Sequence, residues 1–459
     1  MEKLFHLKEN GTTVRTEIVA GLTTFFTMAY IIFLNPDFVG TLNLETVDKP
    51  DPFFIMPDSA VVTGTCIAAA IGTWLVGILS NYPLAQAPGL GLNAIFGYTL
   101  CLGFKLPAEA ALAAVFIGGV LFIILTVTGA RTAMVKAIPL SLKKAISAGI
   151  GMFIALIGFS ESGIVIQGNG TTVDLAAFSS PKVIVALIGL IIITILVIQK
   201  VPGAIFIGMI LTAGIGNIAH FVFGFDMGIV VPESWVPNID FSMFGKCFTG
   251  FGALFSAPIA SVIAVLITLI LVDMFDTIGT LIGAADKAGF LDENGHLPKM
   301  ENAMMADALA TTTGAVFGTS TVSTYIESTA GIAVGGRTGL TSMVTGLCFV
   351  LSMFLTPIVG FIPRCATTPV LIIVGIMMCS SLKDIDWGDL ETAFPCFFTV
   401  VGMPFFYSIT DGMAFGFISY IIVKIARGKI KEINPLLFVI VALFVVMYVL
   451  AGLQDLKII

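Results

Sequence analysis

The segment LAQAPGLGLNA (residues 84–94) interrupts an apolar stretch with one proline and two glycines. A second interruption, GTSTVSTYIES (residues 318–328), is unusually rich in hydroxyl side chains. Backbone that is not helical at membrane depth persists only where protein or a water-filled cavity satisfies its polar groups. The matched pair therefore predicts two half-helices whose amide ends point at one central cavity, whereas a single kink would be weak evidence.

The composition predicts that lipid surrounds most of the chain. Of its 459 residues, 57% are hydrophobic and 11% are charged, and the mean hydropathy is +1.04. A soluble globular protein carries roughly 25% charged residues. This balance excludes a cytosolic enzyme, a disordered scaffold and a small secreted domain held by disulfides. The net charge of −7 argues against a nucleic-acid binder, which needs a basic face.

Apolar runs predict two sets of seven membrane spans. A spanning helix needs roughly 20 apolar residues. A further apolar stretch, 436–453, is either a fifteenth span or a helix lying along the membrane, and the sequence leaves this open. The first set lies near 18–35, 60–80, 85–102, 109–128, 138–160, 181–199 and 203–223, and the second near 254–285, 303–317, 319–336, 339–361, 366–382, 389–409 and 411–427.

Basic residues predict the orientation of these spans, because lysine and arginine favour cytoplasmic loops. Three basic clusters fall on one side, so we expect the amino terminus and these clusters to be cytoplasmic. We interpret them as topology signals and not as binding patches. Arg364 falls on the opposite side, as an exception. The clusters are Lys3, Lys8 and Arg15; Arg131, Lys136, Lys143 and Lys144; and Lys424, Arg427, Lys429 and Lys431.

The odd number of spans in each set predicts an inverted repeat, since the second set must run in the opposite direction to the first. Many secondary transporters have this plan, and their sites form from interrupted helices at the interface of the repeats. The expected fold class is an all-α polytopic membrane protein with about 14 transmembrane segments in two inverted repeats of seven.

Acidic residues inside the spans mark the candidate site. Asp273 and Asp276 lie three residues apart on one helical face, which Thr277 extends, and Glu327 lies in the second interruption. A carboxyl group at the bilayer centre costs about 2.5–3.5 kcal/mol, so it should face protein or water. Burial and a neighbouring carboxylate favour bound protons, as a proton-coupled carrier requires. Alternatively, these acids bridge helices or cap half-helices without titrating.

Asn93 offers one acceptor and two donors at the first interruption. It is either an N-cap of the half-helix that follows or a group that holds a planar ligand from the other side of the cavity. Seven scattered cysteines and three isolated histidines give no support for a metal site. No arrangement of a nucleophile and a base suggests an enzyme.

Several motifs resemble those of the AzgA-like purine permeases in the nucleobase transporter superfamily. The similarity covers nearly the whole chain, and the motifs occur in the family's order without departure. They are GTTVRTE (11–17) with AGLTTF (20–25), QAPGLGLNA (86–94), FDTIGTLIG (275–283) with DKAG (286–289), and YIES (325–328) with GGRTGLT (335–341).

The resemblance implies a uracil-permease-like fold with a core domain and a gate domain. On the span count, the core comprises 1–133 and 254–362, and the gate comprises 134–253 and 363–459, which includes the last apolar segment. It further implies proton-coupled uptake of guanine, hypoxanthine or adenine across the cell membrane. The expected partners are a purine nucleobase, protons and membrane lipids, and not nucleic acid, with no cofactor beyond the coupling proton and with a homodimer left open.

The resemblance also implies the residues of the site. Asn93, Asp276 and Glu327 are expected at the purine, together with Thr277 and Ser328. Asp276, Asp273 and Glu327 are expected to carry the coupling proton. The preferred purine and the choice between proton and sodium stay open.

Three other functions compete with purine transport. An anion carrier or exchanger on the same fold would favour a basic or amide-lined pocket, which the central acids argue against. A membrane-embedded enzyme would need a nucleophile and base or metal ligands. A receptor or scaffold would not need paired interrupted helices.

Overall fold

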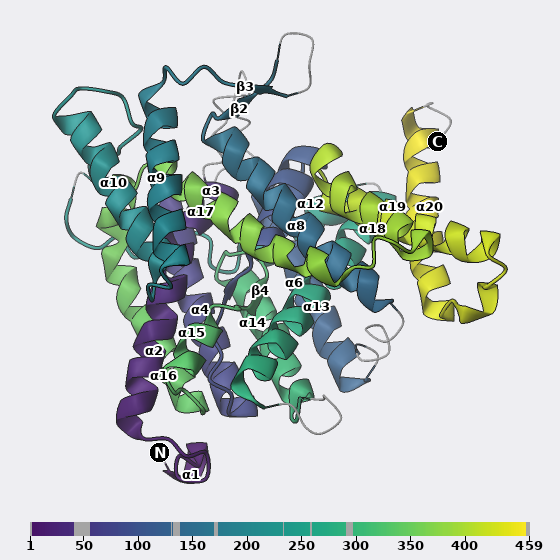
Figure 1. Cartoon of the computed structure of the whole chain (residues 1–459), viewed down its shortest axis with the longest axis horizontal. Coiled ribbons are helices and arrows are strands. Elements are labelled where there is room, and N and C mark those ends of the chain that lie inside the picture. Colours follow the sequence, from purple (N-terminus) through teal and green to yellow (C-terminus); the bar gives the residue numbers. More distant parts are fainter. Residues whose placement is uncertain are drawn as a thin grey trace.

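The computed structural model describes residues 2–40, 56–129, 131, 138–168, 173–232, 234–257, 259–290 and 297–455. Within these ranges, ten helices are long and apolar enough to cross a membrane. The helices pack side by side, and the few strands are very short (Figure 1). The chain is therefore a multi-pass membrane protein.

Every span expected from the sequence coincides with a helix or with an interrupted segment. Most of the expected ends agree with the observed ends to within a few residues. Short helices α1 (Glu2–Phe5), α11 (Lys246–Thr249), α12 (Phe251–Ser256) and η6 (Ile430–Glu432), and strands β2 (Val165–Ile166) and β3 (Asp174–Leu175), lie outside the main spans.

The first half contains α2 (Val14–Met28), α3 (Ile31–Val39), α4 (Asp58–Ser80), β1 (Gln86–Pro88), α5 (Leu90–Ala94), η3 (Ile95–Gly103), α6 (Ala108–Val127), α8 (Leu140–Glu161), α9 (Pro181–Ile198) and α10 (Ala204–Phe221). The second half contains α13 (Ile259–Ala288), α14 (Met300–Val316), β4 (Val322–Thr324), α15 (Ser328–Ala333), α16 (Gly339–Ser352), η4 (Met353–Phe361), α17 (Arg364–Met378), η5 (Cys379–Asp384), α18 (Leu390–Phe405), α19 (Ile409–Ala426) and α20 (Pro435–Asp455).

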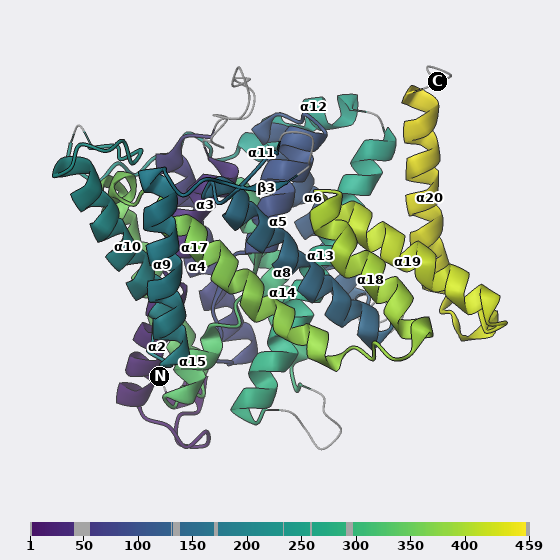
Figure 2. The ribbon, with the colours of Figure 1, turned by 45° about the horizontal axis from the view of Figure 1, so that its top comes forward.

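The helices form two groups that each draw on both halves of the chain. In the first bundle, which we define as α2–α6 with α13–α16, α16 packs on α2 and α4, and α14 packs on α4 and α6. In the second bundle, defined as α8–α10 with α17–α19, α17 packs on α8 and α9, and α18 packs on α8 and α19. Figure 2 shows the second bundle running along one side of the first.

Glycines allow the closest helix contacts within each bundle. A Cβ atom added to Gly339 would lie 2.1 Å from the carbonyl oxygen of Gly77, which joins α16 to α4. A Cβ atom added to Gly375 would lie 2.4 Å from the carbonyl oxygen of Gly151, which joins α17 to α8. Membrane helices associate through such small-residue contacts because lipid provides no hydrophobic driving force between them.

The last apolar stretch forms α20, which contacts α13 and α19 at the edge of the molecule (Figure 2). Leu437, Ile440 and Phe444 are buried on one face, whereas Val439 and Val446 are exposed on the other. A helix whose outward side chains are as apolar as its inward ones suits a lipid environment and not water.

Candidate functional site

The two interruptions meet inside the first bundle as a two-stranded antiparallel sheet. Gln86 in β1 lies opposite Thr324 in β4, and Pro88 lies opposite Val322. The ladder extends beyond both ends of the strands, because the amide of Gly89 donates to Thr321 at 3.0 Å and that of Tyr325 donates to Ala85 at 3.0 Å. The unwound backbone thus satisfies itself, as it must at membrane depth. The expected meeting is confirmed, although the strand pairing was not predicted.

Asp276 approaches this sheet from α13. Its Oδ2 accepts a hydrogen bond of 2.9 Å from the hydroxyl of Ser323 in β4. The same oxygen would lie 3.5 Å from a Cβ atom added to Gly89, at the end of β1. The carboxylate therefore lies against both interrupted segments, half-buried in the first bundle.

Glu327 ends the second interruption and contacts the junction between α2 and α3. Its Oε1 accepts a hydrogen bond of 2.5 Å from the hydroxyl of Tyr30, which is buried. Asp276 contacts the same interruption through Ser323, which precedes Glu327 by four residues. Two acids from different helices thus serve one region. Sequence reasoning missed Tyr30, because nothing distinguishes a single tyrosine in an apolar span.

Asn93 lies inside α5 and is fully buried. Its Oδ1 accepts a hydrogen bond from the hydroxyl of Ser320, and its Nδ2 has no hydrogen-bond partner among the described residues. The N-cap of α5 is Gly89, so the N-cap interpretation of Asn93 is wrong. A buried donor left unsatisfied costs about 1–3 kcal/mol, and a ligand oxygen or ring nitrogen could remove that cost.

The hydroxyls of Thr277 and Ser328 are engaged within the protein. Thr277 donates to Oδ1 of Asp307 at 2.7 Å. Ser328 accepts from the amide of Ala85 at 3.0 Å and donates to the carbonyl of Tyr325 at 2.7 Å, which fastens the two interruptions together. Their expected contact with a purine stays a prediction.

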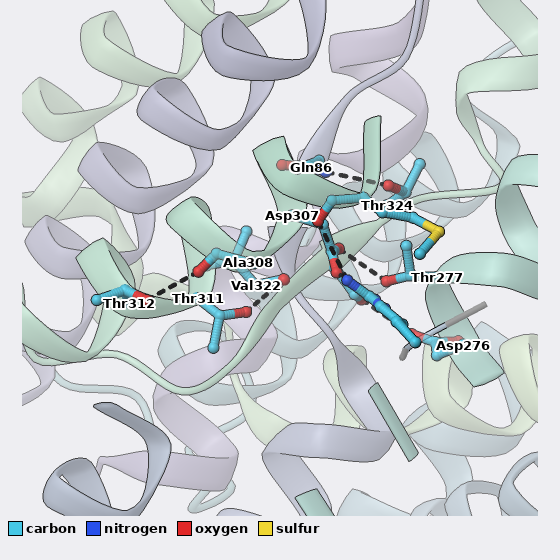
Figure 3. A network of polar contacts seen from close by, with 12 residues as sticks. Gln86, Asp276, Thr277, Asp307, Ala308, Thr311, Thr312, Val322 and Thr324 are labelled. Atoms are coloured by element: carbon cyan, nitrogen blue, oxygen red, sulfur yellow. Dashed lines mark hydrogen bonds and ion pairs between the residues drawn. The ribbon is translucent and has the colours of Figure 1, made fainter. Parts of the chain in front are cut away.

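A buried charge cluster is centred on Asp307, to which Thr277 donates its hydrogen bond (Figure 3). Arg131 and Asp307 are both fully buried, and Nη2 of Arg131 lies 2.9 Å from Oδ2 of Asp307. Nη1 of Arg131 donates to the carbonyl of Met304 at 3.1 Å, and its guanidinium lies 4.5 Å from the centre of the Phe122 ring. Interpreting Arg131 as a topology signal was therefore wrong, because it is the internal counter-charge of Asp307. Asp307 lies in the span expected at 303–317, so the rule that selected the other acids could have found it.

Asp273 is fully buried in the same region of α13. Neither of its carboxylate oxygens receives a hydrogen bond from any described residue. A carboxylate in such a place is costly unless it is paired or neutral. The arrangement is compatible with the expected proton site, which stays a prediction.

No group of three or more histidine, cysteine, aspartate or glutamate side chains is placed to hold a metal ion anywhere in the described part of the chain. The side chains gathered around β1 and β4 are carboxylates, an amide and hydroxyls. Such groups can exchange hydrogen bonds with a polar, uncharged ligand and can bind protons.

Replacing Gly89 with alanine is expected to displace Ser323 from Asp276, because the new Cβ atom would lie 2.6 Å from the Ser323 hydroxyl. A lost hydrogen bond of this kind costs about 1 kcal/mol, so ligand affinity should fall about fivefold. The matched control is Gly279→Ala on α13, where an added Cβ meets nothing within 4 Å. Equal affinities of the two variants, measured by ligand binding to the purified protein, would contradict the close approach at Gly89.

The chain is similar to known proteins along nearly its whole length. A family model described as "Permease family" matches residues 15–410. Guanine/hypoxanthine permease PbuO from Bacillus subtilis is 43% identical over 448 residues, covering 96% of this chain and 98% of the relative. Adenine permease AdeP from Escherichia coli is 38% identical over 445 residues, covering 97% of this chain and 95% of the relative.

A solved structure shares the fold. The transmembrane domain of the cyanobacterial bicarbonate transporter BicA superposes with a TM-score of 0.62 at 13% identity, covering 87% of this chain and 97% of that domain. At this identity the likeness concerns the fold alone. It confirms the expected architecture of two inverted repeats of seven spans.

Proposed function

The chain belongs to the permease family, and from that premise we propose that it imports a purine nucleobase together with a proton. It is a transporter and not an enzyme. The names of its relatives support a nucleobase as the substrate, with guanine, hypoxanthine and adenine as candidates. The observation that carries the proposal is the pair of carboxylates, Asp276 and Glu327, beside the joined interruptions. We place the protein in the cell membrane with its amino terminus in the cytoplasm.

The purine binds as a neutral ring between the two carboxylates and Asn93. Glu327 and Asp276 accept its N–H groups, and Nδ2 of Asn93, which lacks a hydrogen-bond partner, donates to a ring nitrogen or carbonyl oxygen. Tyr30 and Tyr325, whose ring centres lie 6.5 Å apart, offer an aromatic wall beside Glu327. This set of acceptors and one donor matches the edge of a purine and would repel an anion.

Transport proceeds by alternating access, with the first bundle as the core domain and the second as the gate domain. Protonation of Asp276 removes a buried charge and allows the core to move past the gate, because a neutral carboxyl group crosses a low-dielectric environment at lower cost. Asp273 and Glu327 are further proton acceptors in the same region. The core comprises residues 1–133 and 254–362, and the gate comprises 134–253 and 363–459.

The test is uptake of labelled guanine, hypoxanthine and adenine by proteoliposomes. One proton crossing 100 mV supplies about 2.3 kcal/mol, so we expect accumulation of roughly fiftyfold, with more when the outside is acidic. A protonophore should abolish accumulation of the purine. Replacing the sodium ions in the buffer should leave accumulation unchanged. Competition by unlabelled adenine, guanine, hypoxanthine, xanthine and uracil identifies the preferred base, with bicarbonate as the control. Absence of uptake for every purine would overturn the proposal.

A further inference from the structure

A cluster of charged side chains joins the two bundles near the end of α3. Arg364, the first residue of α17, lies between two carboxylates. Its Nη1 is 3.1 Å from Oε2 of Glu161, and its Nε is 3.7 Å from Oδ1 of Asp37. Each of the three side chains is about one quarter exposed. Their charges thus meet at a place that is neither fully buried nor open.

The contacts cross the boundary between the bundles in both directions. Asp37, on α3 of the first bundle, also accepts a hydrogen bond of 2.7 Å from Thr367 on α17 of the second. Tyr98, on η3 of the first bundle, donates at 2.8 Å to Glu161 on α8 of the second. Together with Arg364 these residues line one small pocket. This end of the boundary is therefore fastened by paired donors and acceptors and not by apolar packing alone.

Two stretches of helix connect the cluster with the candidate site. Asp37 follows Tyr30, the partner of Glu327, by seven residues along α3, which is about 10 Å at 1.5 Å per residue. Tyr98 follows Asn93 in the continuous helical stretch of α5 and η3. Helices α3 and α17 lie side by side, far from the amino terminus (Figure 1). The cluster therefore closes the boundary between the two bundles at the end that leads from the site to the side of the membrane opposite the amino terminus.

We propose that Arg364 is a gating residue, which holds the site closed on this side and must release Asp37 before the site can open there. The proposal rests on the proposed function, since it needs the first bundle to move against the second. Partly exposed ion pairs contribute only about 0.2–1 kcal/mol each, which suits contacts that form and break in every cycle. The proposed gating role also accounts for the presence of Arg364 on the side of the membrane where basic residues are rare.

The proposal is tested by the accessibility of a cysteine in the pocket. Leu371 lines the pocket and is buried, so Leu371→Cys should react slowly with a membrane-impermeant thiol reagent, with the modification read at that position by mass spectrometry. Adding Arg364→Gln or Asp37→Asn should accelerate labelling about two- to fivefold from this side. Arg364→Lys should restore slow labelling in part. The exchanged pair Asp37→Arg with Arg364→Asp should label more slowly than either single change.

Transport kinetics separate gating from a merely structural role. A weakened closed state should lower the KM for purine on this side and lower the maximal rate, whereas a folding defect lowers the amount of active protein at unchanged KM. Unchanged labelling in both Arg364→Gln and Asp37→Asn, with the proteins folded, would overturn the proposal. The labelling needs no substrate, so it stands or falls independently of whether the unaltered protein imports a purine.

Discussion

Replacing Glu327 with glutamine is expected to reduce purine uptake about ten- to a hundredfold. The amide keeps an oxygen that can accept the hydrogen bond from Tyr30, so the pocket should retain its shape. What is lost is the charge, and hydrogen bonds to charged groups contribute about 1.5–3 kcal/mol. The measurement is kcat/KM for labelled guanine or adenine in proteoliposomes, with the dissociation constant measured separately on the purified protein.

Asp276→Asn separates binding from coupling. Asparagine can still accept from Ser323, but it cannot take up a proton, so accumulation driven by a pH gradient should disappear while exchange of labelled for unlabelled purine continues. The matched control is Glu109→Gln, which removes a partly exposed carboxylate paired with Lys246 and should change uptake less than twofold. Normal accumulation by both Glu327→Gln and Asp276→Asn would refute the proposed site.

Replacing Arg131 with glutamine is expected to destabilise the protein by about 3–5 kcal/mol. The change leaves Asp307 buried and charged without its cation, and breaking a buried pair from one side is strongly unfavourable. The double variant Arg131→Gln with Asp307→Asn removes both charges and should recover most of the loss. The measurement is the thermal unfolding midpoint of the purified protein in detergent.

Asp273→Asn provides the control for that series. Asp273 lies in the same buried region, but no described residue donates a hydrogen bond to it, so removing its charge should leave the unfolding midpoint unchanged or raise it. An Arg131→Gln protein that unfolds at the same temperature as the unaltered one would contradict the assignment of Arg131 as the counter-charge of Asp307.

Much of the fold could be predicted because helices that contact lipid are apolar along their length, so the hydropathy of the sequence identifies them. The spans expected near 181–199 and 203–223 correspond to α9, Pro181–Ile198, and α10, Ala204–Phe221. The meeting of the two interruptions followed from the repeat plan. The pairing of β1 with β4 could not be predicted, because a strand of three residues is too short to show a periodic pattern. The same reason explains the missed β2–β3 hairpin.

The candidate site could be predicted only where an unusual residue type drew attention. An acidic residue in an apolar span is energetically costly and is therefore easy to notice in a sequence. This criterion selected Asp276 and Glu327, and it should also have selected Asp307. Arg131 follows a span beside other basic residues, so its sequence context indicates a cytoplasmic charge, and only the packing of α14 against α6 reveals its burial. The sequence alone does not indicate a role for Tyr30, because that role depends on the break between α2 and α3.

The pairing of β1 with β4 also constrains how the protein is made. The strand at Gln86–Pro88 leaves the ribosome long before its partner at Val322–Thr324. Thr73 on α4 pairs with the backbone of Gln86 within the first half, but the carbonyl of Ala85 and the amide of Gly89 bond to the second interruption. Until the second half arrives, water, another protein or the translocation machinery must satisfy those two groups, because acyl chains cannot. The amino-terminal half is therefore an unfinished folding intermediate during biosynthesis, and its maturation waits for translation of nearly three quarters of the message.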